Sequence, residues 1–177
     1  MGKVSMPKFC PVCTDSESLV LMDGTRVERS YPPGHRSFYI DRVKGVIYKI
    51  GYGSDNDGLT YERMRPADRS FVATVYGWGS FIGCKRRKKG QAHTWVAMEF
   101  VDTLSEPINR MLDNGEESKL LSALIKATHD DLLPVLQEYD LEWDNYRNNV
   151  GYNWSLRPNL RPVILDLVSA EDYEATD

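Results

Sequence analysis

A chain of 177 residues with 41% hydrophobic and 27% charged residues is long enough for one ordinary domain or one two-lobed unit. This composition excludes a collagen-like, low-complexity or wholly disordered protein, and no apolar run approaches the roughly 18 residues of a membrane span. The net charge of −4 is unevenly distributed, because residues 1–90 carry 16 Lys and Arg against 9 Asp and Glu, and residues 91–177 carry 6 against 17. We expect two lobes with different surfaces, and neither membranes nor nucleic acids as partners.

The first thirty residues contain a Cys-x-x-Cys pair, Cys10 and Cys13. Their spacing is that of half a zinc site, and the candidates for the other half are Cys84 with His93 or His35. A structural zinc and two free or buried thiols at a turn are the alternatives. The start of the chain has no apolar signal-peptide core, so we expect a reduced, cytoplasmic compartment.

Residues 35–100 show the pattern of an antiparallel sheet with one short helix. The helix is expected over Leu59–Arg65, where Pro66 stops it. The basic run 85–89 is expected at the solvated tip of a hairpin. The strands are expected over Ser37–Ile40, Gly45–Ile50, Phe71–Tyr76, Ser80–Cys84 and His93–Phe100.

After Asp102 the pattern changes to helix. Pro107 predicts a helix start, and an apolar stripe predicts a longer helix over Glu116–His129. The run from Asp130 to Pro134 is expected to break or restart that helix, and a short strand is expected over 162–165. The expected fold class is therefore α+β, with a β-rich N-terminal lobe over residues 1–101 and a mainly helical lobe over 102–177.

Three polar features, each made of one or two residues, follow one another along these expected elements. Lys49 lies in an apolar strand run, Asp144 is followed five residues later by Asn149, and Asp166 ends the short C-terminal strand. In this order the features resemble those of the protein-kinase fold. More narrowly, the segments 45–51, 144–151 and 162–166 resemble the small kinase-like proteins of tailed bacteriophages and their bacterial relatives. The resemblance covers about residues 34–170 and implies a minimal two-lobed kinase-like fold.

The resemblance implies an ATP- and Mg²⁺-dependent phosphotransferase that acts on a hydroxyl group. Lys49 would pair with the α- and β-phosphates, and Glu62 on the short helix would hold Lys49 in place. Asp144 would accept the proton of the acceptor hydroxyl. Asn149 and Asp166 would hold Mg²⁺ through oxygen atoms, the ligands that this hard cation prefers.

The resemblance also implies where the nucleotide binds. Backbone groups near Glu99 and Val101, at the hinge between the lobes, would bind adenine. Gly34 is the one glycine in the segment that would cover the phosphates.

The sequence departs from the kinase pattern in ways that leave a second function open. Glu142-Trp143 precede Asp144 where kinases have His-Arg, and Leu167-Val168 follow Asp166 where they have Phe-Gly. We expect a trimmed core that lacks the activation segment and the later helices. The alternative to an enzyme is a pseudokinase-like binding module that inhibits or redirects a partner protein, such as a host factor in the host cytoplasm if the protein is phage-encoded.

Overall fold

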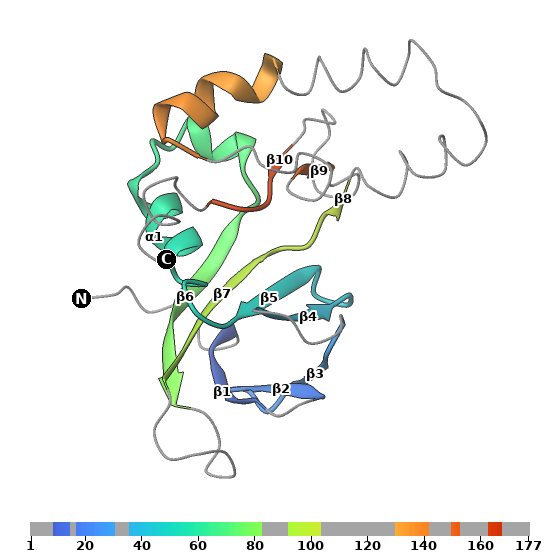
Figure 1. Cartoon of the computed structure of the whole chain (residues 1–177). Helices are drawn as coiled ribbons and strands as arrows, with labels where there is room; N and C mark the ends of the chain where they lie inside the picture. The colour runs from blue at the N-terminus through green and yellow to red at the C-terminus, as the bar shows by residue number, and fades with distance from the viewer. Residues whose placement is uncertain are drawn as a thin grey trace, which may run out of the picture. The chain divides into compact units, whose positions relative to one another are not determined.

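The computed structural model describes residues 9–14, 17–30, 36–82, 92–103, 130–141, 150–152 and 163–167 (Figure 1). Within these residues the fold is α+β, with antiparallel strands in three sheets, one helix in the first half of the chain and helical residues over 130–138. The chain divides into two compact units, the first unit Met1–Glu62 with Thr74–Phe100 and the second unit Arg63–Ala73 with Val101–Asp177.

The first unit begins with a three-stranded antiparallel sheet that the sequence patterns did not indicate. Its strands follow chain order: β1 (Pro11–Thr14), β2 (Ser18–Leu21) and β3 (Arg26–Glu28). A turn that contains Asp23 and Gly24 joins β2 to β3. Gly24 has a φ of 84°, and the Asp23 Oδ1 atom accepts a hydrogen bond of 2.9 Å from the Thr25 amide. Positive φ favours glycine at this position.

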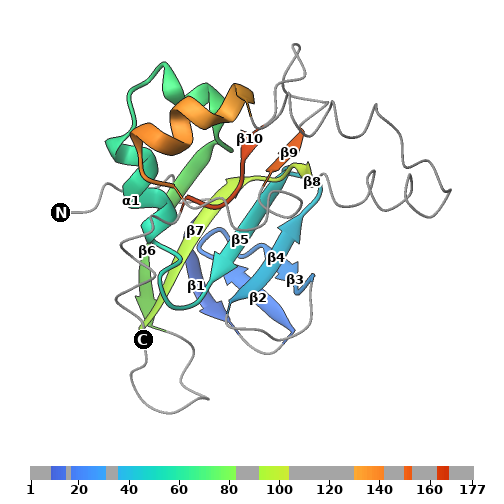
Figure 2. The same ribbon diagram turned by 45° about the horizontal axis from the view of Figure 1, so that its top comes forward.

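A four-stranded antiparallel sheet follows in the first unit (Figure 2). The hairpin expected at 37–50 is confirmed as β4 and β5, and the strand expected over 93–100 is confirmed as β7, which pairs with β6. The sheet order is β4-β5-β7-β6. The strands are β4 (Ser37–Asp41), β5 (Val46–Ile50), β6 (Val75–Ile82) and β7 (Ala92–Glu99).

The prediction of two strands over 71–76 and 80–84 was wrong. One strand, β6, runs through Gly77 and Gly79, which pair with Ala97 and Trp95 of β7. A register shift between Val75 and Gly77 and a φ of 153° at Gly79 let the strand continue past the glycines, which in the sequence indicated a break. A single 3-10 turn, η2 (Asp68–Phe71), occupies the residues before it.

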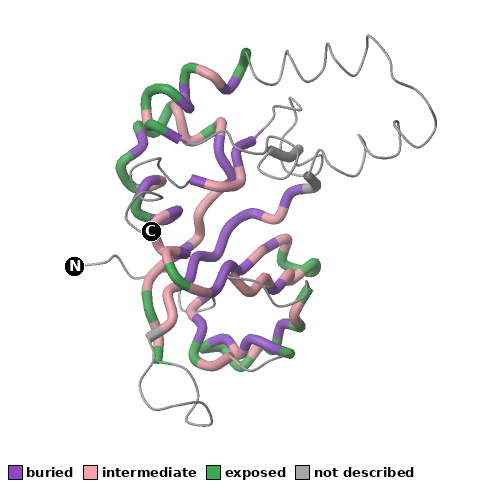
Figure 3. Tube along the Cα trace, viewed as in Figure 1, coloured by how far each residue is buried: buried purple, intermediate pink, exposed green. Residues whose placement is uncertain are grey.

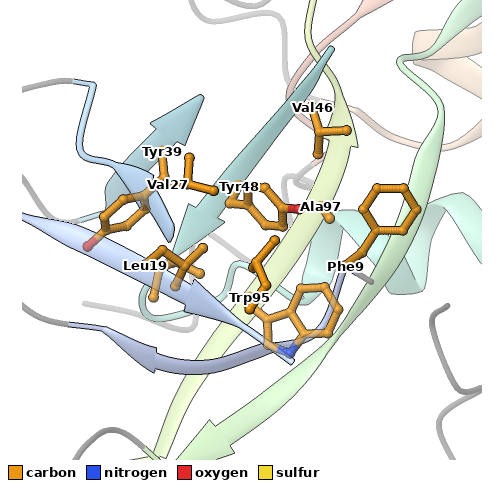
Figure 4. Close-up of a cluster of buried hydrophobic side chains, with 10 residues drawn as sticks. Phe9, Leu19, Val27, Tyr39, Val46, Tyr48, Trp95 and Ala97 are labelled. Atoms are coloured by element: carbon orange, nitrogen blue, oxygen red, sulfur yellow. The ribbon is translucent and has the colours of Figure 1, made fainter. Parts of the chain in front are cut away.

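The two sheets of the first unit share one hydrophobic core (Figure 4). Alternate side chains of β5 face this core, because successive side chains of a strand point to opposite faces. The ring of Phe9 stacks on that of Tyr76, with 5.1 Å between the centroids. Figure 3 shows the central strand β7 buried over most of its length. The buried members of the cluster are Phe9, Leu19, Leu21, Val27, Tyr39, Val46, Tyr48, Ile50, Trp95 and Ala97.

The short helix α1 (Asn56–Arg63) starts three residues earlier than expected. The added residues include Gly58, which stands just before the helix expected from Leu59. A Cβ built on Gly58 would lie only 2.0 Å from the Cγ atom of Trp78, so the absence of a side chain lets the helix approach β6 closely. The helix ends at Arg63, before Pro66 and two residues earlier than the expected Arg65.

The second unit contains a small antiparallel sheet in addition to helix. Its strands are β8 (Asp102–Thr103), β9 (Val150–Tyr152) and β10 (Val163–Ile164), in the order β10-β9-β8. The strand expected near 162–165 is confirmed as β10, whereas β8 and β9 were not expected. Pro134 lies inside the helical residues 130–138, so the helix continues through it. The residues before Asp130, from which the expected break or restart would be judged, lie outside the described ranges. The helices expected between 105 and 129 lie outside the described residues.

The segment Arg63–Ala73 belongs to the second unit, although it was expected in the N-terminal lobe. Val72 forms a parallel bridge with Ile164, and the Ala73 amide donates a 2.9 Å hydrogen bond to the Ile164 carbonyl. Tyr139 adds a second link, because its hydroxyl donates to Asp68 Oδ2 at 2.6 Å and accepts from the Arg65 amide at 2.9 Å. In the part of the chain described, no helix is long and apolar enough to span a bilayer.

Candidate functional site

The strand lysine that the sequence singled out is buried and ion-paired. Lys49 is 6% exposed, and its Nζ atom donates a 2.8 Å hydrogen bond to the Oδ2 atom of Asp57, which is fully buried. Tyr48 and Ile50 face the core shared by the two sheets, so Lys49 points to the opposite face of β5, where α1 lies. The pair therefore joins strand β5 to helix α1.

The electrostatics of this pair depend on its burial. Removing two charges from water is costly, and their mutual attraction compensates only when the geometry is close and hydrogen-bonded, as the 2.8 Å contact is. Asp57 is the second residue of α1, where the partial positive charge of the helix N-terminus also favours a carboxylate. The arrangement holds the ammonium group of Lys49 in one place.

Glu62 was the helix residue expected to hold Lys49, and the helix residue that the structure pairs with Lys49 is Asp57. The two acidic residues are five positions apart, about 140° around an ideal helix. Because Asp57 faces the sheet, Glu62 lies on a different side of α1, and its side chain is exposed. The sequence did not reveal Asp57 because the helix was expected to begin after it.

Glu99 and Val101, the residues expected near the hinge, are both buried. The Oε2 atom of Glu99 accepts hydrogen bonds from the backbone amide of Thr74 at 3.0 Å and from its hydroxyl at 2.9 Å. The neighbouring Phe100 amide donates to the Gly45 carbonyl at 2.8 Å. These contacts fix the end of β7, and adenine binding by the hinge backbone stays a prediction.

Asp166 is half-buried and follows β10 by two residues. Strands β9 and β10 pair antiparallel, with Ile164 opposite Val150. The end of β10 that leads to Asp166 therefore lies beside the start of β9, the strand that Asn149 immediately precedes in the sequence. Asn149 itself, together with Asp144 and Gly34, lies outside the described residues.

The described residues contain no group of three His, Cys, Asp or Glu side chains that could hold a metal. Mg²⁺ does not require such a group, since it is usually bound through one or two protein oxygen ligands, nucleotide phosphates and water. The carboxylate of Asp166 fits that mode. For the zinc alternative, Cys10 forms no disulfide bond, Cys13 is disulfide-bonded, and the candidate ligands Cys84 and His35 lie outside the described ranges.

Comparison with protein-family models gives no match for this chain, and comparison with curated proteins gives no significantly similar sequence. The functional argument therefore rests on the local geometry.

Asp57 could have been found from the sequence as an acidic residue in the first turn of a helix that begins after Asp55.

Proposed function

We propose that this protein binds ATP with Mg²⁺ and transfers the γ-phosphate to a hydroxyl group, in the manner of a trimmed protein-kinase core. The observation that carries the proposal is the buried pair of Lys49 and Asp57 at 2.8 Å. Protein kinases position their phosphate-binding lysine in the same way, by a carboxylate on the helix that follows the lysine-bearing strand. Here the carboxylate is that of an aspartate in the first turn of α1.

The second unit supports the proposal through the hairpin of β9 and β10. In kinases the metal-binding residues are an Asn of the catalytic loop and an Asp beyond the following strand. Here Asn149 immediately precedes β9 and Asp166 follows β10, and these two strand ends pair. We propose that Asp166 and Asn149 hold Mg²⁺ with the nucleotide phosphates.

The proposed reaction is an in-line displacement. The acceptor oxygen forms a bond to the γ-phosphorus while the bond from that phosphorus to the β–γ bridging oxygen breaks, and ADP leaves. The proton of the acceptor hydroxyl passes to the carboxylate of Asp144. Lys49 neutralises phosphate charge during the displacement. Because its ammonium group is already held in place, the side chain does not have to move as the reaction proceeds.

Thermal and urea unfolding with and without nucleotide test the proposal. Wild-type protein should be stabilised by about 2.7 kcal/mol when ATP with Mg²⁺ is at a hundredfold excess over Kd. Asp166→Asn should remove the Mg²⁺-dependent part of this gain and the phosphate transfer. Asp140→Asn is the matched control, because Asp140 is exposed with a φ of 52°, a conformation that asparagine tolerates well.

The results separate the two functions that the sequence left open. Stabilisation by ATP together with phosphate transfer to a hydroxyl acceptor supports the enzyme. Stabilisation without any transfer, to water or to an added acceptor, supports the pseudokinase-like binding module. A wild-type protein that ATP does not stabilise, with or without Mg²⁺, would contradict the proposal.

A further inference from the structure

We propose that Thr94 is a positioning residue for phosphate transfer: its hydroxyl group fixes the loop between β5 and α1, and through this loop the positions of Lys49 and Asp57. The inference rests on the proposed function, in which the ammonium group of Lys49 pairs with the phosphates of ATP. Neither the polar features of the sequence nor the contact between Lys49 and Asp57 assigns any role to Thr94.

Thr94 lies on the strand next to the one that carries Lys49, and on the same face of the sheet. β5 and β7 pair antiparallel, and Ile50 lies opposite Trp95 in the hydrophobic core. Because successive side chains of a strand point to opposite faces, the residues just before these two, Lys49 in β5 and Thr94 in β7, face away from that core. The hydroxyl of Thr94 is therefore directed to the side of the sheet where Asp57 pairs with Lys49.

Thr94 ties the loop between β5 and α1 to β7 through both its side chain and its backbone. Its hydroxyl group donates a hydrogen bond to the carbonyl of Gly51 and accepts one of 3.1 Å from the amide of Ser54. Its carbonyl accepts a 3.0 Å bond from the amide of Gly51. One side chain thus bridges the first and the fourth residue of the loop.

The loop needs such a bridge because of its glycines. Gly51 and Gly53 have φ values of 144° and 70°, which favour glycine, and glycine restricts the backbone least of all residues. The loop begins two residues after Lys49, and α1, whose second residue is Asp57, follows it directly. The bridge made by Thr94 therefore spans most of the chain between the two members of the ion pair.

The consequence for the ion pair follows from how its two elements are held. β5 is paired with a strand on each side, whereas the first turn of α1 is joined to β5 through the bridged loop. Without the hydroxyl of Thr94, we expect α1 to carry the carboxylate of Asp57 away from its 2.8 Å contact with Lys49. Phosphate transfer is sensitive to such a shift, because a misplacement of about 1 Å can lower a rate about a hundredfold.

Titration calorimetry with ATP and with adenosine, both with Mg²⁺, tests the inference. Thr94→Val removes the hydroxyl group and keeps a β-branched side chain. It should weaken ATP binding about tenfold, equivalent to about 1.4 kcal/mol. Adenosine binding should change by no more than about twofold, because adenosine has no phosphate for Lys49 to contact. The rate of phosphate transfer at saturating ATP should fall about tenfold or more.

Two further variants separate positioning from a general loss of stability. Thr94→Ser keeps the hydroxyl group and should have the ATP affinity and the transfer rate of the wild type. Thr60→Val removes the same group from a buried threonine of α1 whose hydroxyl has no hydrogen-bond partner among the described residues, so it should also behave like the wild type. Losses that Thr60→Val shares would overturn the inference.

The remaining results distinguish this inference from the proposed function. Equal ATP affinity and rate in wild type and Thr94→Val, or equal losses for ATP and adenosine, would overturn the role of Thr94 and leave the proposed function standing. A wild type that binds neither ATP nor inorganic tripolyphosphate would overturn both. If Thr94→Val does not fold, as judged by circular dichroism, hydrogen–deuterium exchange of the wild type decides. ATP with Mg²⁺ should then slow exchange of the Ser54 amide that Thr94 holds, and an unchanged rate there overturns the inference.

Discussion

A lysine inside an apolar strand is stable only if its charge has a partner, and in this protein the partner is Asp57. The two side chains are 6% and 0% exposed and lie 2.8 Å apart. A pair buried to this degree adds little net stability over a well-packed apolar pair, yet breaking it is costly. A small net contribution to stability combined with a large cost of breaking the pair is expected where a lysine is held in place for binding. This difference can be measured by substituting one or both residues.

Lys49→Met should lower the free energy of unfolding by about 3–5 kcal/mol, because it leaves the buried carboxylate of Asp57 without its cation. The double variant Lys49→Met/Asp57→Leu should recover most of that loss. Urea unfolding of the single and double variants measures the coupling. Lys44→Met is the control, since Lys44 pairs with Asp23 at the surface at 3.3 Å and should change stability by at most about 1 kcal/mol. Additive effects of the two buried substitutions would contradict the prediction.

Tyr48 provides a pH-dependent test of the core. Burial, followed by the nearby charges of Asp41 and Asp23, raises the pKa of the Tyr48 hydroxyl above its ordinary value of about 10. Tyrosine in the unfolded chain loses its proton above about pH 10 while folded Tyr48 keeps it, so the unfolded state binds fewer protons and stability falls as pH rises above this value.

Tyr48→Phe should therefore flatten the loss of stability between pH 9 and pH 11, the range about the pKa of an unfolded tyrosine. At neutral pH the variant should be as stable as the wild type or more stable by about 1 kcal/mol, because within the described residues the buried hydroxyl has no hydrogen-bond partner. Denaturant titrations at each pH measure both effects. An unchanged slope above pH 10 would show that Tyr48 is not the group responsible.

At the scale of the elements, helix α1 is positioned by a glycine. Gly58 stands in the first half of the helix, where glycine is normally unfavourable by about 1 kcal/mol relative to alanine. The side chain of Trp78 occupies the space that a Cβ would need. The helix therefore gives up intrinsic stability for close packing against β6, and this packing brings Asp57 to the sheet.

Gly58→Ala should consequently destabilise the protein by about 1–3 kcal/mol, the range for overpacking, although helix propensity alone predicts the opposite sign. Glu62→Ala on the exposed side of the same helix is the control and should change stability by no more than about 0.5 kcal/mol. Combining Gly58→Ala with Trp78→Leu should relieve the clash, so the double variant should lose less than the sum of the single variants. Thermal unfolding measures all four proteins, and a stabilised Gly58→Ala would contradict the packing argument.

How far the sequence predicts these elements depends on their length and pattern. β4 and β5 were predicted because two apolar runs flank a polar turn, and β7 because it contains the apolar run Trp95–Met98. The strands β1, β3, β8 and β9 have two to four residues each and show no periodicity, so only tertiary pairing defines them. Asp57 was missed for a related reason, since Gly58 and the residues before it read as a loop until their contact with Trp78 is known.

At the scale of the whole molecule, the two units differ in charge. The first unit carries 13 Lys and Arg against 9 Asp and Glu, and the second carries 9 against 17. The first unit ends at Phe100, and Arg63–Ala73 belongs to the second. The chain therefore passes between the units more than once, and a fragment that ends near residue 101 would separate Val72 from Ile164, with which it pairs.

The proposed residues are divided between the units, because Lys49 belongs to the first and Asp166 to the second. Hydrogen–deuterium exchange with ATP and Mg²⁺ should therefore slow amide exchange in both: in β5 and α1 through Lys49 and Asp57, and in β9 and β10 through Asp166. A ligand at a hundredfold excess over Kd can slow exchange up to about a hundredfold at amides whose opening requires its release.

Removing Mg²⁺ with EDTA should abolish the protection of β9 and β10 and leave that of β5 and α1. The Asp166→Asn variant should show the same pattern with Mg²⁺ present. Protection confined to the first unit in the wild type with Mg²⁺ would show that Asp166 does not bind the metal, because a carboxylate that coordinates the ion must be ordered by it.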